Sequence, residues 1–106
     1  MVGVIANTPT AHASKYLQQL CKHWQHNLAV EFTPEHGTVI FPKDARGATW
    51  AGDALVTFDA GPDALSVRID ASSDKHAEAM KGVVARHLDR FAFREAPLAF
   101  DWAAAN

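Results

Sequence analysis

Apolar residues return every three or four positions in two segments of the chain, which is the period of a helix with one buried side. The first segment starts near Thr10 or Ser14, either of which is a good capping residue, and ends near Asn27. Its apolar side is formed by Tyr16, Leu17, Leu20, Cys21, Trp24 and Leu28. The second segment starts at Ser72 or Ser73. Its apolar side is formed by Ala77, Met80, Val84, His87, Leu88 and Phe91. We therefore predict two amphipathic helices.

Other segments alternate apolar and polar residues, or are rich in β-formers, as strands are. These runs cover residues 2–7, 28–33, 38–41, 54–60, 65–70 and 98–102. Turn residues separate them, namely Thr8-Pro9, Glu35-His36-Gly37 and Gly61-Pro62-Asp63. Residues 42–53 lack a clear period and predict a long loop, part of which is a candidate edge strand. Residues 103–106 are expected to fray.

The predicted order of elements is β-α-β-β-β-β-α-β. Short links between consecutive strands favour antiparallel pairing, and one apolar stripe on each helix lets both helices cover the same sheet face. We therefore predict a single α+β domain over residues 1–106. It is a two-layer sandwich, with a mostly antiparallel sheet of five or six strands and two helices on one face. The outer sheet face is expected to be solvated or to form a polar dimer interface, since it holds Glu31, Thr57, Arg68 and Asp70.

Composition narrows the classes of partner. The 106 residues include 10 Lys and Arg against 12 Asp and Glu, a formal net charge of −2, with no basic block for nucleic acid or a membrane surface. No run approaches the ~18 apolar residues that span a bilayer, and no export signal is recognisable. Cys21 is the single cysteine, which fits a reducing compartment. We expect a cytoplasmic monomer or homodimer without nucleic-acid or membrane partners.

Familiar catalytic motifs are missing from the sequence. It contains no Gly-rich phosphate loop, no G-x-S-x-G and no H-E-x-x-H. The segment from Cys21 to His26 holds metal-ligating residue types, but on a helix Cys21 and His26 point in nearly opposite directions. His23 and His26 are close enough to share an ion, yet two ligands do not close a metal site. We predict no catalytic residue, metal or cofactor, and a buried Cys21.

For each of three features, the sequence leaves two interpretations open. His87 lies on the inward edge of the second helix, where it is either a hydrogen-bonded core histidine or a ligand or proton-transfer group. Arg86, Arg90 and Arg94 recur every four residues and form either an anion site or a solvated face. Trp50, in a loop that also holds Lys43, Asp44, Arg46 and Asp53, either binds a ligand or folds back as a lid over the sheet.

Three stretches together resemble a known bacterial family. They are Lys15-Tyr-Leu-Gln-Gln-Leu-Cys-Lys-His-Trp-Gln-His26, then Val30-Glu-Phe32 with Gly37-Thr-Val-Ile-Phe-Pro42, then His87-Leu-Asp-Arg-Phe-Ala-Phe-Arg-Glu95 followed by Trp102. Over nearly its whole length the chain resembles domain-of-unknown-function family 2218. The resemblance implies a bacterial source, a fold like that of TATA-binding-protein-like and phosphohexomutase C-terminal domains, and no established activity.

The same resemblance implies a context of iron uptake, because some members look fused to siderophore-interacting flavin reductases. It supplies no catalytic residues. Its signature stretches hold Tyr16, His23, Trp24, His87, Arg90, Phe91 and Arg94. All of these except Phe91, together with Trp50, are our candidate ligand-binding residues. The loop from Pro42 to Asp53 is longer than the family pattern.

Three functions remain open from the sequence. The leading hypothesis is a non-catalytic small-ligand-binding or accessory module, linked in its finer form to iron or siderophore handling. The second is a small enzyme that uses His87 with Arg90 or Arg94 and a carboxylate. The third is a protein–protein adaptor, which would expose an apolar patch or a free strand edge.

Overall fold

A computed structural model describes residues 2–44 and 49–105 of the chain. Its elements are β1 (Val2–Pro9), α1 (Ala13–Trp24), β2 (Ala29–Phe32), β3 (His36–Phe41), β4 (Ala54–Ala60), β5 (Ala64–Ala71), α2 (Asp74–Phe91) and β6 (Ala103–Ala104). The predicted order of elements is thus confirmed. In the described part of the chain, no helix has the length and apolar character that a bilayer crossing requires.

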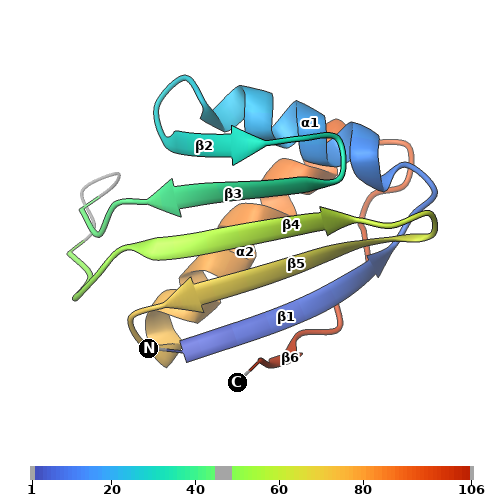
Figure 1. Ribbon diagram of the computed structural model, residues 1–106. Helices are drawn as coiled ribbons and strands as arrows, with labels where there is room; N and C mark the ends of the chain where they lie inside the picture. The colour runs from blue at the N-terminus through green and yellow to red at the C-terminus, as the bar shows by residue number, and fades with distance from the viewer. Residues whose placement is uncertain (1, 45–48, 106) are drawn as a thin grey trace.

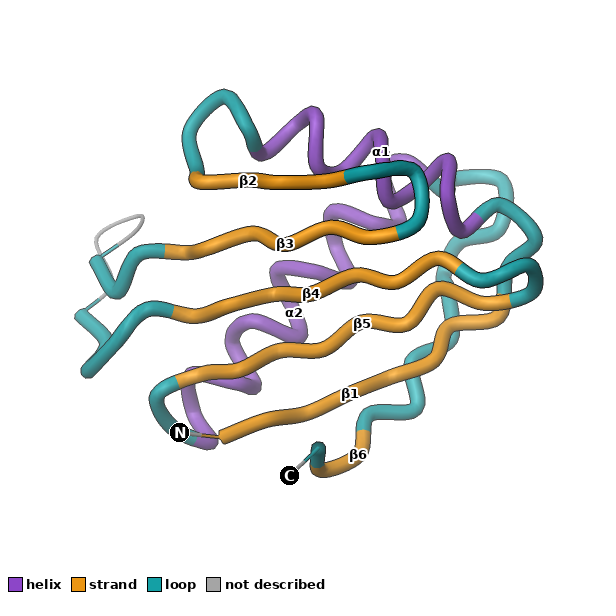
Figure 2. Tube along the Cα trace, viewed as in Figure 1, coloured by secondary structure: helices purple, strands orange, loops and turns teal. Residues whose placement is uncertain are grey.

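The strands form one sheet in the order β2-β3-β4-β5-β1-β6, and every neighbouring pair is antiparallel. Both helices lie behind this sheet in Figure 1 and leave the face toward the viewer open. Figure 2 shows the same two layers along the backbone trace, with α2 crossing the strands and α1 near β2 and β3. The predicted two-layer α+β sandwich is confirmed.

The core lies between the sheet and the two helices. Val39, Val56 and Ile69 align across β3, β4 and β5 and are fully buried on the inner face. The residues that the helical period placed on the apolar sides are buried, apart from Leu28 and Phe91, which are half-buried. The two predicted stripes are therefore confirmed, and the removal of their apolar area from water holds the layers together.

The start of α1 differs from the prediction. His12 occupies the capping position, and no side chain makes a capping hydrogen bond there. Thr10 Oγ1 instead accepts from the backbone N–H of His12, and Ser14 Oγ donates to the carbonyl of Pro34. Thr10 Oγ1 also donates to the carboxylate of Glu95, so both hydroxyls make tertiary hydrogen bonds. At α2 the prediction is confirmed, because Ser73 Oγ accepts from the backbone N–H of His76.

Two turns are placed differently from the prediction. β1 continues through Pro9, which pairs with Ala64 at the end of the strand. Since β6 pairs only with Val4 and Ile5, the missing N–H of Pro9 breaks no ladder on that side. The link between β2 and β3 uses residues 33–35, so Gly37 lies within β3.

The C-terminal strand was also predicted wrongly. Residues 98–102 are not a strand, and only Ala103–Ala104 pairs with β1. The carboxylate of Asp101 accepts from the N–H of Asn7 and occupies the edge of β1 that this segment would have used. The expected fraying is wrong as well for the described part of the tail, because the N–H of Ala105 donates to the carbonyl of Gly3.

The long loop contains no strand among its described residues, which excludes the edge strand there. The N–H of Trp50 donates to the carbonyl of Lys43, and the N–H of Lys43 donates to the carboxylate of Asp53. These bonds close the base of the loop. Residues 45–48, which include Arg46, lie outside the described residues.

Candidate functional site

A cavity of about 580 Å³ opens where the C-terminal end of α1, the first half of α2 and the loop after β3 meet. Its volume lies within the range of typical small-molecule sites. It is lined by His23, Trp24, Asn27, Leu28, Phe41, Pro42, Asp44, Trp50, His76, Ala79, Met80 and Val83. We call it the Trp50 cavity.

Trp24 forms a fixed wall of the Trp50 cavity. It is the last residue of α1, where the apolar stripe of the helix reaches the end of the sheet. Its ring meets Phe41 edge-on, with centroids 5.0 Å apart, and stacks on Phe58 at 6.3 Å. These contacts from β3 and β4 hold the ring in one orientation, as a pre-organised binding surface requires.

Trp50 and His76 form a second aromatic wall. Their rings are parallel within 8°, with centroids 4.4 Å apart. Trp50 therefore folds back, but onto α2 rather than as the suggested lid over the sheet. The backbone N–H of Ser72 donates to His76 Nδ1, which places the proton of the neutral ring on Nε2. Burial lowers the pKa of His76, so the ring is neutral near pH 7.

Sequence reasoning missed His76. The signal for it was present, because His76 lies four positions before Met80 on the apolar side of α2. Its backbone N–H also donates to Oγ of Ser73, the residue that caps α2. A histidine at that place must be buried once α2 packs on the sheet. What the sequence cannot show is that Trp50, 26 positions earlier, stacks on it.

His23 and His87 extend the aromatic cluster behind Trp24. The ring of His87 lies 5.2 Å from Trp24 and 5.7 Å from His23, between centroids. His87 is buried, and its Nδ1 lies 2.7 Å from the carbonyl of Val83, which accepts the hydrogen bond. His23 lines the cavity and is exposed. His87 thus supports the wall that Trp24 forms, and its proposed catalytic use stays a prediction.

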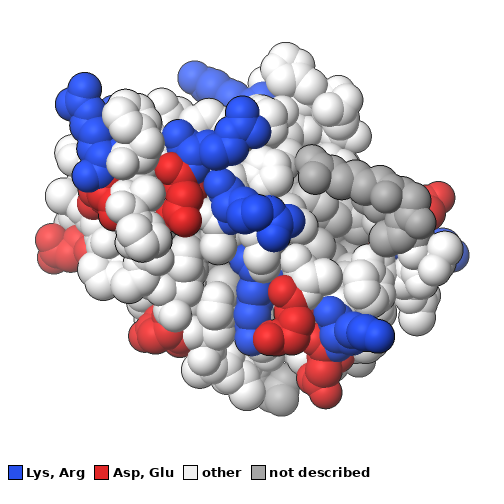
Figure 3. Space-filling model, turned by 180° about the vertical axis from the view of Figure 1, so that it is seen from behind, with Lys and Arg blue, Asp and Glu red and all other residues white. Residues whose placement is uncertain are grey.

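The other three candidate residues lie outside the cavity. Arg90 and Arg94 are exposed near the end of α2, and Arg94 lies over the ring of Phe93. Figure 3 shows Lys and Arg side chains gathered on the helix-covered face of the molecule, projecting outward. This arrangement fits the solvated-face interpretation. A binding role for these arginines stays a prediction, and Tyr16 is engaged elsewhere.

Tyr16 joins α1 to the segment that follows α2. Its hydroxyl donates to the carboxylate of Glu95, which also accepts from Thr10 Oγ1 at 3.0 Å. The hydrogen bond to Glu95, then burial and the carboxylate charge, raise the pKa of Tyr16 to about 12. The bond from Tyr16 lowers the pKa of Glu95. The hydrogen bond between the two side chains therefore stabilises the folded state at pH values above the range in which Glu95 becomes protonated and below the range in which Tyr16 becomes ionised.

Tyr16 gives a direct pH prediction, because it is the single tyrosine of the chain. Its pKa is raised on folding, so its stabilisation is present below the unfolded pKa of about 10 and is lost as the pH rises through the folded value. An absorbance titration should give a pKa of about 12 in the folded protein and about 10 in urea. Tyr16→Phe should remove the alkaline loss of unfolding free energy. Half-ionisation near pH 10 in the folded protein would contradict this.

A resident metal finds no support in the described part of the chain. No group of three or more His, Cys, Asp or Glu is placed there to hold an ion. Cys21 is buried, and burial raises the pKa of its thiol to about 11. The thiol is therefore protonated near neutral pH and packs as a small apolar group.

Comparison with known proteins places the chain in a family and supports its fold. A family model described as "Uncharacterized protein conserved in bacteria (DUF2218)" matches residues 5–103. A solved structure, the NMR structure of PA4090 from Pseudomonas aeruginosa, is similar to this chain at 30% sequence identity with a TM-score of 0.73. The match covers 97% of this chain and 96% of that chain. Among curated proteins no match is found.

Proposed function

The chain belongs to DUF2218, a family of uncharacterised proteins conserved in bacteria, and from that premise we propose that it is a non-catalytic module that binds a small molecule in the Trp50 cavity. The proposal rests on one observation. Trp24, Phe41 and Trp50 come from three separate segments and line the same cavity of about 580 Å³. Pockets of this size with mostly apolar linings are the usual sites of small ligands.

The lining indicates the chemistry of the ligand. Trp24, Phe41 and Met80 offer apolar and polarisable surface, which favours a flat or aromatic body. His23 and Asn27 lie exposed at the rim and offer groups for hydrogen bonding. The ligand we propose is therefore a small, largely apolar molecule that carries a polar group at one end.

The link to iron or siderophores is the finer form of this proposal. The support for this link is the genomic context that the family resemblance implies. That context is an association and does not rest on residues in the cavity. Asp44 is the one carboxylate that lines the Trp50 cavity among the described residues. A ferric siderophore would therefore be bound through the organic part of the molecule, because the cavity does not offer a full set of ligands for the metal itself.

A binding experiment with two tryptophan variants tests the proposal. The probes are anilinonaphthalene sulfonate, indole, haem and a ferric hydroxamate siderophore. A probe that binds should raise the melting temperature, since a ligand at about 100 times its Kd adds about 2.7 kcal/mol. Trp50→Ala should weaken binding at least about fivefold, because stacking of a ring on an aromatic side chain is worth roughly 1–3 kcal/mol.

Trp102→Phe is the control, because Trp102 lies outside the Trp50 cavity. It should leave the affinity for the probe unchanged. Urea unfolding of both variants separates a lost contact from a lost fold. The proposal fails if no probe binds, or if Trp50→Ala and Trp102→Phe affect the affinity equally. Binding of the siderophore alone among the probes would favour the iron-related form.

An exposed apolar pair on the open sheet face favours the adaptor hypothesis. Ile40 and Leu55 face each other across β3 and β4 on the open sheet face and are both exposed. The next residue in that row is Asp70 of β5, which limits the apolar area. A stable protein interface buries about 800 Å² per partner. Ile40→Lys should therefore dissociate any dimer or complex formed through this face, measured by light scattering.

A further inference from the structure

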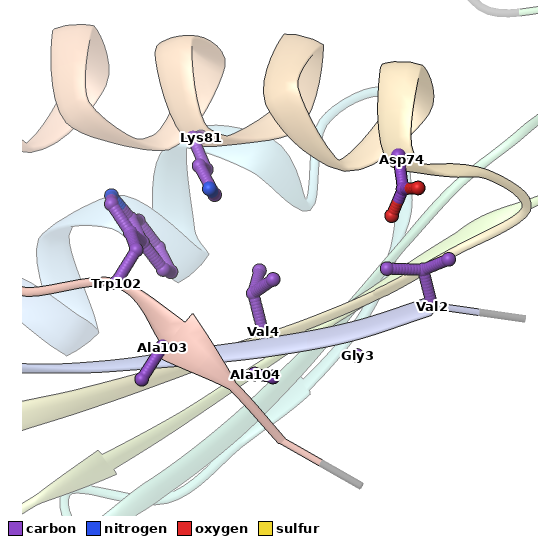
Figure 4. Close-up of a pocket in the computed structure, with 8 residues that line it drawn as sticks. All are labelled: Val2, Gly3, Val4, Asp74, Lys81, Trp102, Ala103 and Ala104. Carbon is purple, nitrogen blue, oxygen red and sulfur yellow. The ribbon is translucent and has the colours of Figure 1, made fainter.

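A second hollow, of about 290 Å³, lies between α2 and the sheet edge formed by β1 and β6. None of the residues that line it also lines the Trp50 cavity. Figure 4 shows its construction, with α2 above, β1 below and Trp102 at one end. The side chains of Asp74 and Lys81 both point from α2 into the gap.

The fold places the two charges at opposite ends of one apolar floor. Asp74 and Lys81 are seven positions apart on α2, which is about two turns, so they share a face with Cα atoms about 10 Å apart. Val2 and Val4 of β1 form the floor between them. The pairing of Ala104 with Val4 brings Trp102 to the Lys81 end. The hollow is thus bipolar, with an anion at one end and a cation at the other.

Lys81 remains available to a ligand. Its Nζ lies 5.8 Å from the centre of the Trp102 ring and 2.5 Å from Glu78 Oε2. The side chain of Glu78 is 68% exposed, against 24% for Lys81, so this is a solvated ion pair of small net strength. An ammonium group has three donors, and Glu78 uses one of them. Two donors on Lys81 are therefore left for an incoming carboxylate.

Asp74 is the complementary acceptor. Among the described residues, none donates a hydrogen bond to its carboxylate or forms an ion pair with it. Its place in the first turn of α2 favours a negative charge through the helix dipole. The dipole accounts for an acidic residue at this position, but not for a lysine and a tryptophan that meet two turns away beside the same hollow.

From these observations we propose that the hollow binds a small zwitterion, with its ammonium group at Asp74 and its carboxylate at Lys81. A short ω-amino acid carries these two charges at opposite ends of one methylene chain, and this chain would lie on Val2 and Val4. The site is independent of the function proposed for the Trp50 cavity.

An NMR titration of ¹⁵N-labelled protein with γ-aminobutyrate tests the proposal. Saturable shifts are expected for the Trp102 indole and for amides near Asp74. Butyrate and butylamine, which keep one charge each, should bind at least about tenfold more weakly, because each loses a charge-assisted hydrogen bond. Asp74→Asn and Lys81→Met should each weaken γ-aminobutyrate at least about tenfold as well.

Lys75→Met is the matched control for charge on the same helix, because Lys75 is exposed and does not line the hollow. It should leave the affinity unchanged, and so should Trp50→Ala, which separates this site from the Trp50 cavity. Binding of butyrate or butylamine as strong as that of γ-aminobutyrate would overturn the proposal. Equal effects of Lys75→Met and Lys81→Met, or the absence of saturable shifts, would do the same.

Discussion

Phe58→Ala should lower the free energy of unfolding by about 3–5 kcal/mol. Phe58 is 0% exposed and is the largest fully buried side chain among the described residues. It lies on the inner face of β4 and stacks on Trp24 of α1, so its removal leaves a void between the sheet and the helix. Such a void is costly, because close-packed interiors relax only partly around a deletion.

Urea unfolding followed by circular dichroism measures this effect. Phe93→Ala is the control, because Phe93 is 70% exposed and its removal should change the free energy by no more than about 0.5 kcal/mol. Domains of this size are stable by only about 5–15 kcal/mol, so Phe58→Leu provides a milder variant if Phe58→Ala does not fold. Equal effects at positions 58 and 93 would show that the assignment of the core is wrong.

The second large effect is expected at Gly37. A Cβ atom added there would lie 2.9 Å from Cys21 Sγ and 3.2 Å from Phe32 Cβ. Both distances are shorter than ordinary contacts, and Cys21 is fully buried on α1. Gly37→Ala should therefore cost about 1–3 kcal/mol through overpacking between β3 and α1. A glycine is required at position 37 because α1 lies close to β3 there.

A double-mutant cycle with Cys21→Ala isolates the cause. If Sγ is the obstacle, Gly37→Ala should cost less in the Cys21→Ala background than in the natural sequence, by at least about 0.5 kcal/mol. Gly52→Ala is the control, because among the described residues its added Cβ meets no atom nearer than Ser72 Cβ at 3.8 Å. Additive effects of Gly37→Ala and Cys21→Ala would show that Cys21 Sγ is not the obstacle and that Phe32 causes the overpacking.

Both predictions also bear on the Trp50 cavity. Trp24 rests on Phe58, and Cys21 lies one turn before Trp24 on the same side of α1. A shift of α1 away from β3 or β4 would therefore move one aromatic wall of the cavity. Probe binding should weaken in Phe58→Leu even though Phe58 itself does not line the cavity. A fluorescence titration of the variant measures this coupling.

Local patterns in the sequence were sufficient for the helices and most strands. The buried sides of α1 and α2 follow from a period that each segment carries by itself, and β4 and β5 follow from β-formers bounded by Gly61-Pro62-Asp63. The cap at Ser73 is likewise local. The family was recognised from three short stretches, and its model matches residues 5–103. These features depend on neighbours within a few residues.

The candidate site was only partly accessible to such reasoning. His23, Trp24 and Trp50 were singled out from the sequence and line one cavity, whereas Tyr16 is held by Glu95, 79 positions away. His87 became the support for Trp24 because α1 and α2 lie next to each other on the sheet. No periodicity within one segment specifies a contact between two segments.

The sequence by itself thus determined α1, α2 and the strands β1 to β5, and the buried side of each helix, because these depend on local spacing and on the burial of apolar area. Only the tertiary structure decided that Trp50 stacks on His76, that Ala103–Ala104 completes the sheet beside β1, and that Asp74 and Lys81 face one hollow with Trp102. Each of these depends on residues far apart in the chain, and their positions are settled only when the two layers pack together.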